Sequence, residues 1–177
     1  MNENKELKFQ KLKICILTIS SSRELSDDKS GDVLEERILG FGHELFERKI
    51  TKDNKDSIKN IIINWSKEKE IDVIITTGGT GLTETDVTPE VLEEIFEKTI
   101  PGFSVIFHNI SFNKIKTSTI QSRATAGILM ETFIFALPGS PSAVKDGWDE
   151  ILRYQLDSRH KPCNFVEILP RLKENVD

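Results

Sequence analysis

The sequence predicts an α/β fold, a three-layer α/β/α sandwich with a mainly parallel central sheet. Short apolar runs of strand length at residues 12–19, 73–77 and 130–137 are typical of strands buried on both faces. The segments between these runs place apolar residues at helical spacing. Strands that alternate with helices form a parallel sheet with helices on both faces. The 177 residues suit one domain, and we expect a flexible N-terminal arm at 1–11 and a single domain at 12–177.

The composition argues against several classes of protein. Apolar residues make up 37% and charged residues 30%, as in folded globular proteins. The net charge of −5 argues against a nucleic-acid binder, which would present a basic face. No apolar run approaches the roughly 18 residues of a membrane span, and the first residues lack a signal-peptide core. Two cysteines without C-x-x-C spacing fit a reducing compartment, so we expect a cytoplasmic protein.

The first part of the chain predicts two strands and two helices. The run at 12–19 is nearly continuous in apolar residues, which indicates a central strand. Apolar residues four and seven positions apart predict a helix over 32–41, and 43–51 is read as a shorter strand. The most regular helical pattern of the sequence then predicts a helix from about Asp53 to Lys69.

A glycine-rich segment follows the next predicted strand. The β-rich run at 73–77 is stopped by the glycines of 78–81. Thr88 as N-cap and Pro89 at the first helical position then predict the start of a helix. The Ile-Pro-Gly sequence at 100–102 ends this helix.

The last third predicts a short helix, a strand and a final helix. Apolar spacing places the short helix over about 103–110 and the buried strand at 130–137. Ser140 as N-cap and Pro141 at the first helical position start the last helix. The polar tail, 157–177, is expected to pack as an extended arm or against a neighbouring subunit.

Three polar loops follow the predicted buried strands: Ser20–Arg23, Gly78–Asp86 and Pro138–Ser140. The carboxyl ends of parallel strands meet at one edge of the sheet, so these loops should converge. Glycines let backbone N–H groups approach an anion, and helix N-termini favour phosphate. A tight turn would explain the glycines alone, and a solvated loop would explain the serines. The convergence favours a site for a phosphorylated ligand.

Two carboxylates and one arginine are candidates for this site. Asp53 has two interpretations, an N-cap of the helix that follows or a metal ligand. Asp86 precedes the Thr88 cap by two residues and has no evident structural task. Asp53 and Asp86 together would suit magnesium, which takes one or two carboxylates and completes its shell with phosphate oxygens and water. Arg123 would either neutralise a phosphate or form a surface ion pair. The three histidines lack ligand spacing, and no nucleophile motif is present.

The chain also carries four motifs in a fixed order: Gly78-Gly79-Thr80-Gly81, Asp86-Val87-Thr88-Pro89-Glu90, Ser122-Arg123-Ala124-Thr125-Ala126-Gly127 and Pro138-Gly139-Ser140-Pro141. From about Leu12 through the tail, the chain with these motifs resembles the molybdenum-cofactor biosynthesis family MoaB/MogA. The tail around Gln155–Phe165 resembles the MoaB branch in particular.

This resemblance implies a molybdopterin adenylyltransferase with the MoaB/MogA-like fold. Such an enzyme transfers AMP from ATP to the terminal phosphate of molybdopterin, requires Mg²⁺ and releases pyrophosphate. Its product is the substrate of the molybdate-insertion protein. The resemblance also implies a homotrimer or homohexamer.

The resemblance further implies roles for individual residues. The paired aspartates of the family match Asp53 and Asp86, which would be catalytic and hold the metal. The glycine loop and the Pro138-Gly139-Ser140 turn match the phosphate and nucleotide walls of the family. With Ser20 and Ser21, which are predicted from the polar loop after the first strand rather than from the resemblance, the residues expected to bind substrate and nucleotide are Ser20, Ser21, Gly78, Gly79, Thr80, Gly81, Ser122, Arg123, Pro138, Gly139 and Ser140. Ser122 and Arg123 match the pterin side of the family site. Thr85 stands where adenylyltransferases usually carry arginine, which favours an alternative, a non-catalytic molybdopterin carrier.

Overall fold

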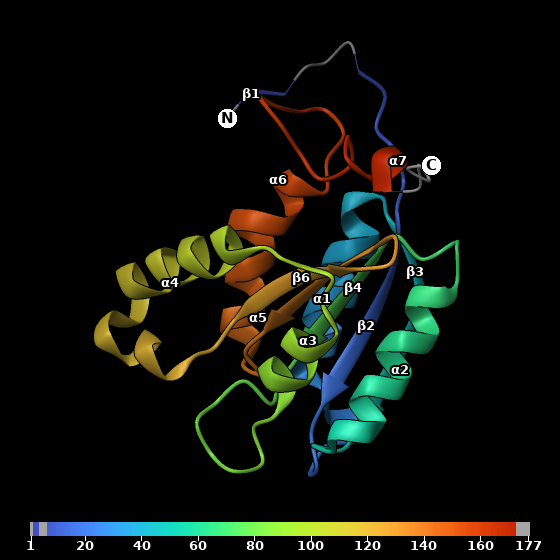
Figure 1. Ribbon diagram of the computed structural model, residues 1–177. Helices are drawn as coiled ribbons and strands as arrows, with labels where there is room; N and C mark the ends of the chain where they lie inside the picture. Colours follow the sequence, from blue (N-terminus) through green and yellow to red (C-terminus); the bar gives the residue numbers. More distant parts are fainter. Residues whose placement is uncertain (1, 4–6, 173–177) are drawn as a thin grey trace.

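The computed structural model of the protein describes residues 2–3 and 7–172, and it has a six-stranded sheet at its centre (Figure 1). From one edge to the other, the strands are β3 (Glu44–Thr51), β2 (Lys13–Ile19), β4 (Val73–Thr77), β7 (Thr132–Leu137), β6 (Thr125–Leu129) and β5 (Lys98–Thr99). The first four are parallel, β6 is antiparallel to β7, and β5 is antiparallel to β6. The predicted mainly parallel sheet is therefore confirmed.

Helices surround this sheet and connect its strands. The α-helices are α1 (Lys29–Phe41), α2 (Lys55–Lys67), α3 (Thr88–Ile95), α4 (Pro101–Ile115), α5 (Pro141–Gly147), α6 (Arg153–Gln155) and α7 (Leu169–Leu172). Two 3₁₀ segments, η1 (Leu25–Asp27) and η2 (Lys116–Gln121), follow β2 and α4. A π-helical segment, η3 (Trp148–Leu152), joins α5 to α6. In the described part of the chain, no helix is both long enough and apolar enough to cross a membrane.

The alternation of side chains along each strand divides the core into two layers. Ile14 and Ile16 of β2 belong to the cluster that also holds the buried side chains of α1, α4 and α5. Cys15 and Leu17, which point the other way, belong to the cluster with α2 and α3. Successive side chains of a strand face opposite sides of a sheet, so helices cover both faces. The three-layer sandwich is confirmed.

Helix α1 begins three residues before its predicted start. The fully buried Asp28 is its N-cap, and its carboxylate accepts a hydrogen bond from the Gly31 backbone N–H at 3.0 Å. The prediction began with the acidic residue Asp32, but the cap lies one turn earlier. Helix α4 likewise begins at Pro101 and runs to Ile115, beyond the short helix predicted at 103–110.

The strand predicted at 130–137 is half of a hairpin. Strand β7 begins only at Thr132, and Met130, with a φ of 55°, belongs to the turn that leads back from β6. The sequence of β6, Thr-Ala-Gly-Ile-Leu, contains alanine and glycine, which are depleted in strands, so it gives a weak signal. Packing explains its glycine, because a Cβ on Gly127 would lie 2.3 Å from Cγ of Phe96.

The described part of the polar tail packs against the same chain. Val166 and Leu169 are buried, and the ring centroid of Phe165 lies 4.8 Å from that of Phe133 in β7. The Phe165 backbone N–H donates a hydrogen bond to the Gln155 carbonyl at 2.8 Å. Residues 157–172 therefore contact their own domain through turns and the short helix α7, and the predicted packing against a neighbouring subunit stays a prediction.

The N-terminal stretch lies beside this tail (Figure 1). Strand β1 (Asn2–Glu3) pairs antiparallel with β8 (His160–Lys161). The Ser158 hydroxyl accepts a hydrogen bond from the Gln10 N–H and donates one to the Lys8 carbonyl, each at 2.9 Å. The flexibility expected of residues 1–11 stays a prediction, and residues 1 and 4–6 lie outside the described part.

Candidate functional site

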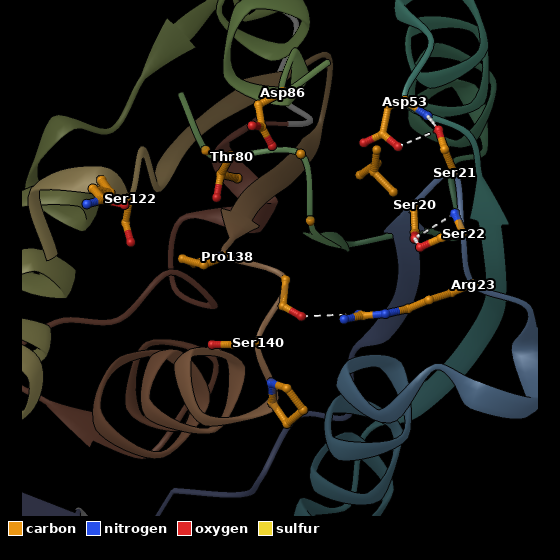
Figure 2. A pocket seen from close by; sticks show the side chains of 17 residues that line it. Ser20, Ser21, Ser22, Arg23, Asp53, Thr80, Asp86, Ser122, Pro138 and Ser140 are labelled. Carbon is orange, nitrogen blue, oxygen red and sulfur yellow. Dashed lines mark hydrogen bonds between the residues drawn. The ribbon is translucent and has the colours of Figure 1, made fainter. Parts of the chain in front are cut away.

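A cavity of about 650 Å³ opens at the carboxyl ends of β2, β4 and β7 (Figure 2). The three polar loops that follow these strands form most of its walls, as the topology predicts, and Asp53, Gln121 and Ser122 complete the lining. The residues that line it are Ile19, Ser20, Ser21, Ser22, Arg23, Asp53, Gly78, Gly79, Thr80, Gly81, Asp86, Gln121, Ser122, Pro138, Gly139, Ser140 and Pro141. All predicted site residues except Arg123 are among them.

The glycine loop requires glycine for two physical reasons. Gly78 and Gly79 have φ values of 101° and 62°, in the left-handed region that favours glycine. A Cβ on Gly78 would lie 2.2 Å from the carbonyl oxygen of Ile19, so any side chain would collide with β2. A Cβ on Gly79 would lie 2.3 Å from the hydroxyl oxygen of Thr88. The loop thus depends on close contact with its neighbours.

Thr88 anchors this loop and is not the cap that we predicted. It is the first residue of α3, and its hydroxyl donates a hydrogen bond to the Gly78 carbonyl at 2.9 Å. The residue before it, Val87, has no side chain able to cap the helix. The buried Thr88 hydroxyl therefore fixes the backbone of the glycine loop.

Asp86 is held in its ionised form by its own loop. Its carboxylate accepts hydrogen bonds from the backbone N–H of Thr83 at 2.9 Å and from the Thr83 hydroxyl. Partial burial raises the pKa of the Asp86 carboxyl. Hydrogen bonds from Thr83 and Gly81 and the charge of Arg123 lower this pKa, and together they outweigh the effect of burial. The net pKa lies below the ordinary value, so Asp86 is a carboxylate at neutral pH.

Asp53 belongs to the pocket and does not cap α2. Asn54 is the N-cap, and its side chain accepts a hydrogen bond from the Ser57 N–H at 2.9 Å. The Asp53 carboxylate instead accepts a hydrogen bond from the Ser21 hydroxyl at 2.6 Å. The N-cap interpretation of Asp53 is therefore wrong, and its carboxylate is available to a ligand.

The two carboxylates both lie against the glycine loop. A Cβ on Gly79 would lie 3.4 Å from Oδ1 of Asp53, and one on Gly81 would lie 2.6 Å from Oδ2 of Asp86. Across the described ranges, no group of three or more His, Cys, Asp or Glu side chains could hold a metal. Two oxygen donors beside an open, polar loop fit magnesium, which leaves most of its shell to water and phosphate.

Arg123 lies behind the glycine loop and is absent from the lining. Its Nε donates a hydrogen bond to the Gly81 carbonyl and its Nη2 to the Asp86 carbonyl, each at 2.7 Å. Its Nη1 forms an ion pair with Glu90 of α3. The arginine therefore ties together the two ends of the loop that carries Asp86. The predicted ion pair of Arg123 is confirmed by its contact with Glu90. Its hydrogen bonds to the Gly81 and Asp86 carbonyls were not predictable from the sequence.

The turn after β7 is fastened to the glycine loop. The Gly78 N–H donates a hydrogen bond to the Leu137 carbonyl at 3.1 Å, and the Thr77 hydroxyl donates one to the Pro138 carbonyl at 3.0 Å. Ser140 caps α5 as predicted, because its hydroxyl accepts a hydrogen bond from the Ala143 N–H at 3.2 Å. Two of the three walls are thus one hydrogen-bonded unit.

Three polar lining residues were not on the list of predicted site residues. Ser22 and Arg23 extend the serine loop after β2, and Gln121 precedes Ser122. Their signal was position, since Ser22 and Arg23 belong to the loop Ser20–Arg23 that was predicted to converge on the site, and Gln121 adjoins the predicted Ser122. The Nη1 of Arg23 reaches the Gly139 carbonyl at 3.2 Å and so bridges the first and third walls (Figure 2).

Comparisons with known proteins show what the chain is similar to. Residues 15–158 match the family described as a probable molybdopterin binding domain. The chain is 42% identical over 166 residues to molybdenum cofactor biosynthesis protein B of Escherichia coli K12, covering 94% of this chain and 96% of that one. It is 37% identical over 145 residues to a probable molybdopterin adenylyltransferase of Methanocaldococcus jannaschii, covering 78% and 86%.

Solved structures give the same result for the fold. A crystal structure of a molybdenum cofactor biosynthesis protein B superposes with a TM-score of 0.83 at 32% identity, covering 92% of this chain and 96% of that one. The tungsten cofactor synthesizing protein MoaB of Pyrococcus furiosus superposes with a TM-score of 0.75 at 31% identity, covering 93% and 99%.

Proposed function

The chain belongs to the MoaB/MogA family of molybdenum cofactor biosynthesis proteins, and we propose that it transfers AMP from ATP to the terminal phosphate of molybdopterin. The observation that carries this proposal is the meeting of two carboxylates with an open glycine loop in one pocket. The name of the Methanocaldococcus relative, a probable molybdopterin adenylyltransferase, supports it. Membership of the fold alone would not support the proposal, because one fold can carry many functions and the function depends on the residues of the site.

The reaction needs positioning and charge neutralisation rather than a protein nucleophile. A terminal phosphate oxygen of molybdopterin attacks the α-phosphorus of ATP, the bond from that phosphorus to the bridging oxygen breaks, and pyrophosphate leaves. The backbone N–H groups of Gly79 and Thr80 in the glycine loop and the hydroxyls of Ser20 and Ser140 are suited to hold phosphate oxygens. The lack of a nucleophile motif in the sequence is consistent with this chemistry.

Asp53 and Asp86 are the residues that would hold a magnesium ion. The hydrogen bond from Ser21 orients the first carboxylate, and those from Thr83 orient the second. The lowered pKa of Asp86 keeps it charged, as a hard cation requires. When bound, the ion supplies positive charge to the phosphate oxygens.

The alternative is a non-catalytic molybdopterin carrier of the same pathway, and one observation favours it. Thr85 occupies the position where adenylyltransferases of this kind usually have arginine. Its hydroxyl lies 3.1 Å from that of Thr83, on the exposed side of the loop. This position therefore contributes no positive charge beside Asp86.

One assay separates the two functions. The purified protein is incubated with molybdopterin, ATP and magnesium, and pyrophosphate and adenylylated pterin are measured. Adenylyl transfer predicts both products in equal amounts and only when all three components are present. Molybdopterin binding without pyrophosphate would support the carrier.

We further propose that the protein self-associates through the outer face of α4, as a trimer or hexamer. Five large apolar side chains of α4 and η2 are exposed: Val105, Ile106, Phe112, Ile115 and Ile120. Helix α4 lies at the side of the molecule in Figure 1. Exposed apolar area of this kind commonly marks an interface. Sedimentation velocity at micromolar concentration should show an oligomer, and a monomer would contradict the proposal.

Two expectations about the cellular setting remain proposals. The adenylylated product would pass to the molybdate-insertion protein, and the reaction would take place in the cytoplasm without nucleic acid or membrane. The acidic net charge and the lack of a membrane-spanning helix among the described residues are consistent with this setting.

A further inference from the structure

The charges that line the pocket do not suit a polyphosphate on their own. Asp53 and Asp86 are the anionic side chains of the lining, and Arg23 is its cationic one. The sum is −1, against a ligand that brings several negative charges. Bound magnesium would raise the sum to +1. Because this sum already includes Arg23, the arginine is the second positive group beside the metal, and its loss has a large effect on the affinity for a polyphosphate. Arg123, the other nearby arginine, is committed to the back of the loop.

Arg23 is held at the pocket by two acceptors on different elements. Its Nη1 donates to the Gly139 carbonyl at 3.2 Å and to the Ser30 hydroxyl oxygen of α1 at 3.3 Å. The side chain is half-buried and reaches across to the turn after β7 (Figure 2). Among the described residues, its Nε and Nη2 have no hydrogen-bond partner. Three N–H donors of the guanidinium fork are therefore free for a ligand.

A buried network fixes the acceptor that holds Arg23. The Ser30 hydroxyl donates its proton to Oδ1 of Asp28 at 3.0 Å, so its lone pairs are left to Arg23. Asp28 and Ser30 are fully buried. The other carboxylate oxygen of Asp28 accepts hydrogen bonds from the Thr18 hydroxyl at 2.6 Å and from Arg48 at 2.9 Å. A chain of contacts thus runs from the core to the pocket wall and preorganises the cation.

We propose that Arg23 binds the phosphate chain of the nucleotide and supplies the positive charge that Thr85 does not. The inference rests on the proposed function for the identity of the ligand. Figure 2 places Arg23 beside the Gly139 turn and away from Ser122, which the family resemblance assigns to the pterin. The free donors of Arg23 match pairs of phosphate oxygens, whereas lysine would offer only a point charge.

The test is calorimetric titration of the full chain with MgATP and, separately, with adenosine. Arg23→Gln should weaken MgATP binding by about 10- to 100-fold, the usual effect of losing charged hydrogen bonds. Arg23→Lys should give an intermediate affinity, because charge without the fork remains. Adenosine affinity should not change, because adenosine lacks phosphates. Arg37→Gln removes an arginine that pairs with Asp149 outside this pocket and should leave both affinities unchanged.

Ser30→Ala tests the positioning network. It keeps the charge of Arg23 but removes one of its acceptors, so MgATP binding should weaken less than in Arg23→Gln. The double variant should then lose little beyond Arg23→Gln alone, because both changes act through the same guanidinium. A purely structural role for Arg23 predicts instead that adenosine and MgATP affinities fall together.

The outcomes also separate this inference from the proposed function. If the unaltered protein binds MgATP through Arg23 but releases no pyrophosphate, Arg23 keeps its assignment and adenylyl transfer is wrong. If Arg23→Gln binds MgATP as tightly as the unaltered protein and transfers AMP normally, the assignment of Arg23 is overturned and adenylyl transfer stands. Failure of the unaltered protein to bind MgATP would overturn both.

Discussion

Asp53 and Asp86 reach the pocket from different loops, and a hydroxyl holds each carboxylate in place. Ser21 orients Asp53, and Thr83 orients Asp86. Neither the Ser21 nor the Thr83 hydroxyl caps a helix, so both hydrogen bonds serve to orient a carboxylate. Residue-scale order of this kind is what electrostatic catalysis requires, because charges that are already oriented need no reorganisation during the reaction.

We predict that Asp86→Asn lowers the rate of AMP transfer by about 10²–10³-fold, the usual cost of removing one electrostatic contributor. The asparagine keeps an acceptor for Thr83, so the melting temperature should stay close to that of the unaltered protein. Glu84→Gln makes the same chemical change at an exposed position of the same loop and should leave the rate unchanged. Equal rates for the two variants would remove Asp86 from the mechanism.

The residue scale is also where the sequence predicted least. An aspartate just before a helical pattern is usually its cap, yet Asn54 takes that role and leaves Asp53 to the pocket. Arg123 stands within a family motif, yet its guanidinium contacts backbone carbonyls behind the glycine loop. The role of Asp53 depends on a one-residue difference in where the helix begins, and the role of Arg123 depends on the direction of its side chain. Neither feature produces a periodic pattern in the sequence.

His43 gives the protein a predictable sensitivity to acid. Burial lowers the pKa of His43 to about 4, against a small opposing effect of Asp157. Its Nδ1 accepts a hydrogen bond from the Leu12 N–H at 3.2 Å, which the charged ring cannot do. The folded-state pKa lies below the unfolded value of 6.5, so the unfolded chain takes up the proton first. The stability is therefore complete above pH 6.5 and falls between pH 6.5 and about 4.

We predict that the free energy of unfolding declines by a few kcal/mol at most over this range and that His43→Asn removes most of the decline. The asparagine retains an acceptor for Leu12 and does not titrate. The variant should be less stable at pH 7 because it leaves a cavity, so the slope with pH is the quantity to compare. Denaturant unfolding at pH 7, 6 and 5 measures it. Equal slopes would show that His43 is not the titrating group.

At the scale of elements, the glycine loop is the least replaceable segment. Gly79→Ala should destabilise the loop by about 1–3 kcal/mol, because it strains a φ of 62° and drives a methyl group into Thr88. Gly40→Ala in α1 meets no atom within 4 Å and should stabilise the protein by about 1 kcal/mol. Thermal unfolding of the two variants checks this contrast. Similar melting temperatures would mean that the loop tolerates a side chain.

Elements with a strong periodic pattern were predictable, and those shaped by packing were not. The helix predicted from Asp53 to Lys69 and the strand at 73–77 match α2 and β4 closely, because burial on one or both faces leaves a clear pattern. Strand β6 was not predicted because it contains Gly127, a residue that is depleted in strands. This position has glycine because the ring of Phe96 leaves no room for a side chain. Its composition reflects a neighbour that is distant in sequence, which no local pattern reveals.

At the scale of the whole molecule, the location of the pocket that we propose as the site was predictable from topology alone. Four parallel strands bring the ends of β2, β4 and β7 to one edge, so their three loops had to converge. The bridge from Arg23 to Gly139 and the bond from Gly78 to Leu137 join those loops into one wall. The chemistry that we propose depends on this assembly rather than on any single motif.

The most direct test of the central claim follows the phosphorus atom itself. ATP labelled at the α-phosphate is incubated with the unaltered protein, magnesium and molybdopterin, and the label is traced by chromatography. We predict that the label moves to molybdopterin, one pyrophosphate appears for each transfer, and Asp86→Asn nearly abolishes the transfer while Glu84→Gln does not. Label that remains in ATP, although molybdopterin is bound, would contradict adenylyl transfer and leave the carrier function in its place.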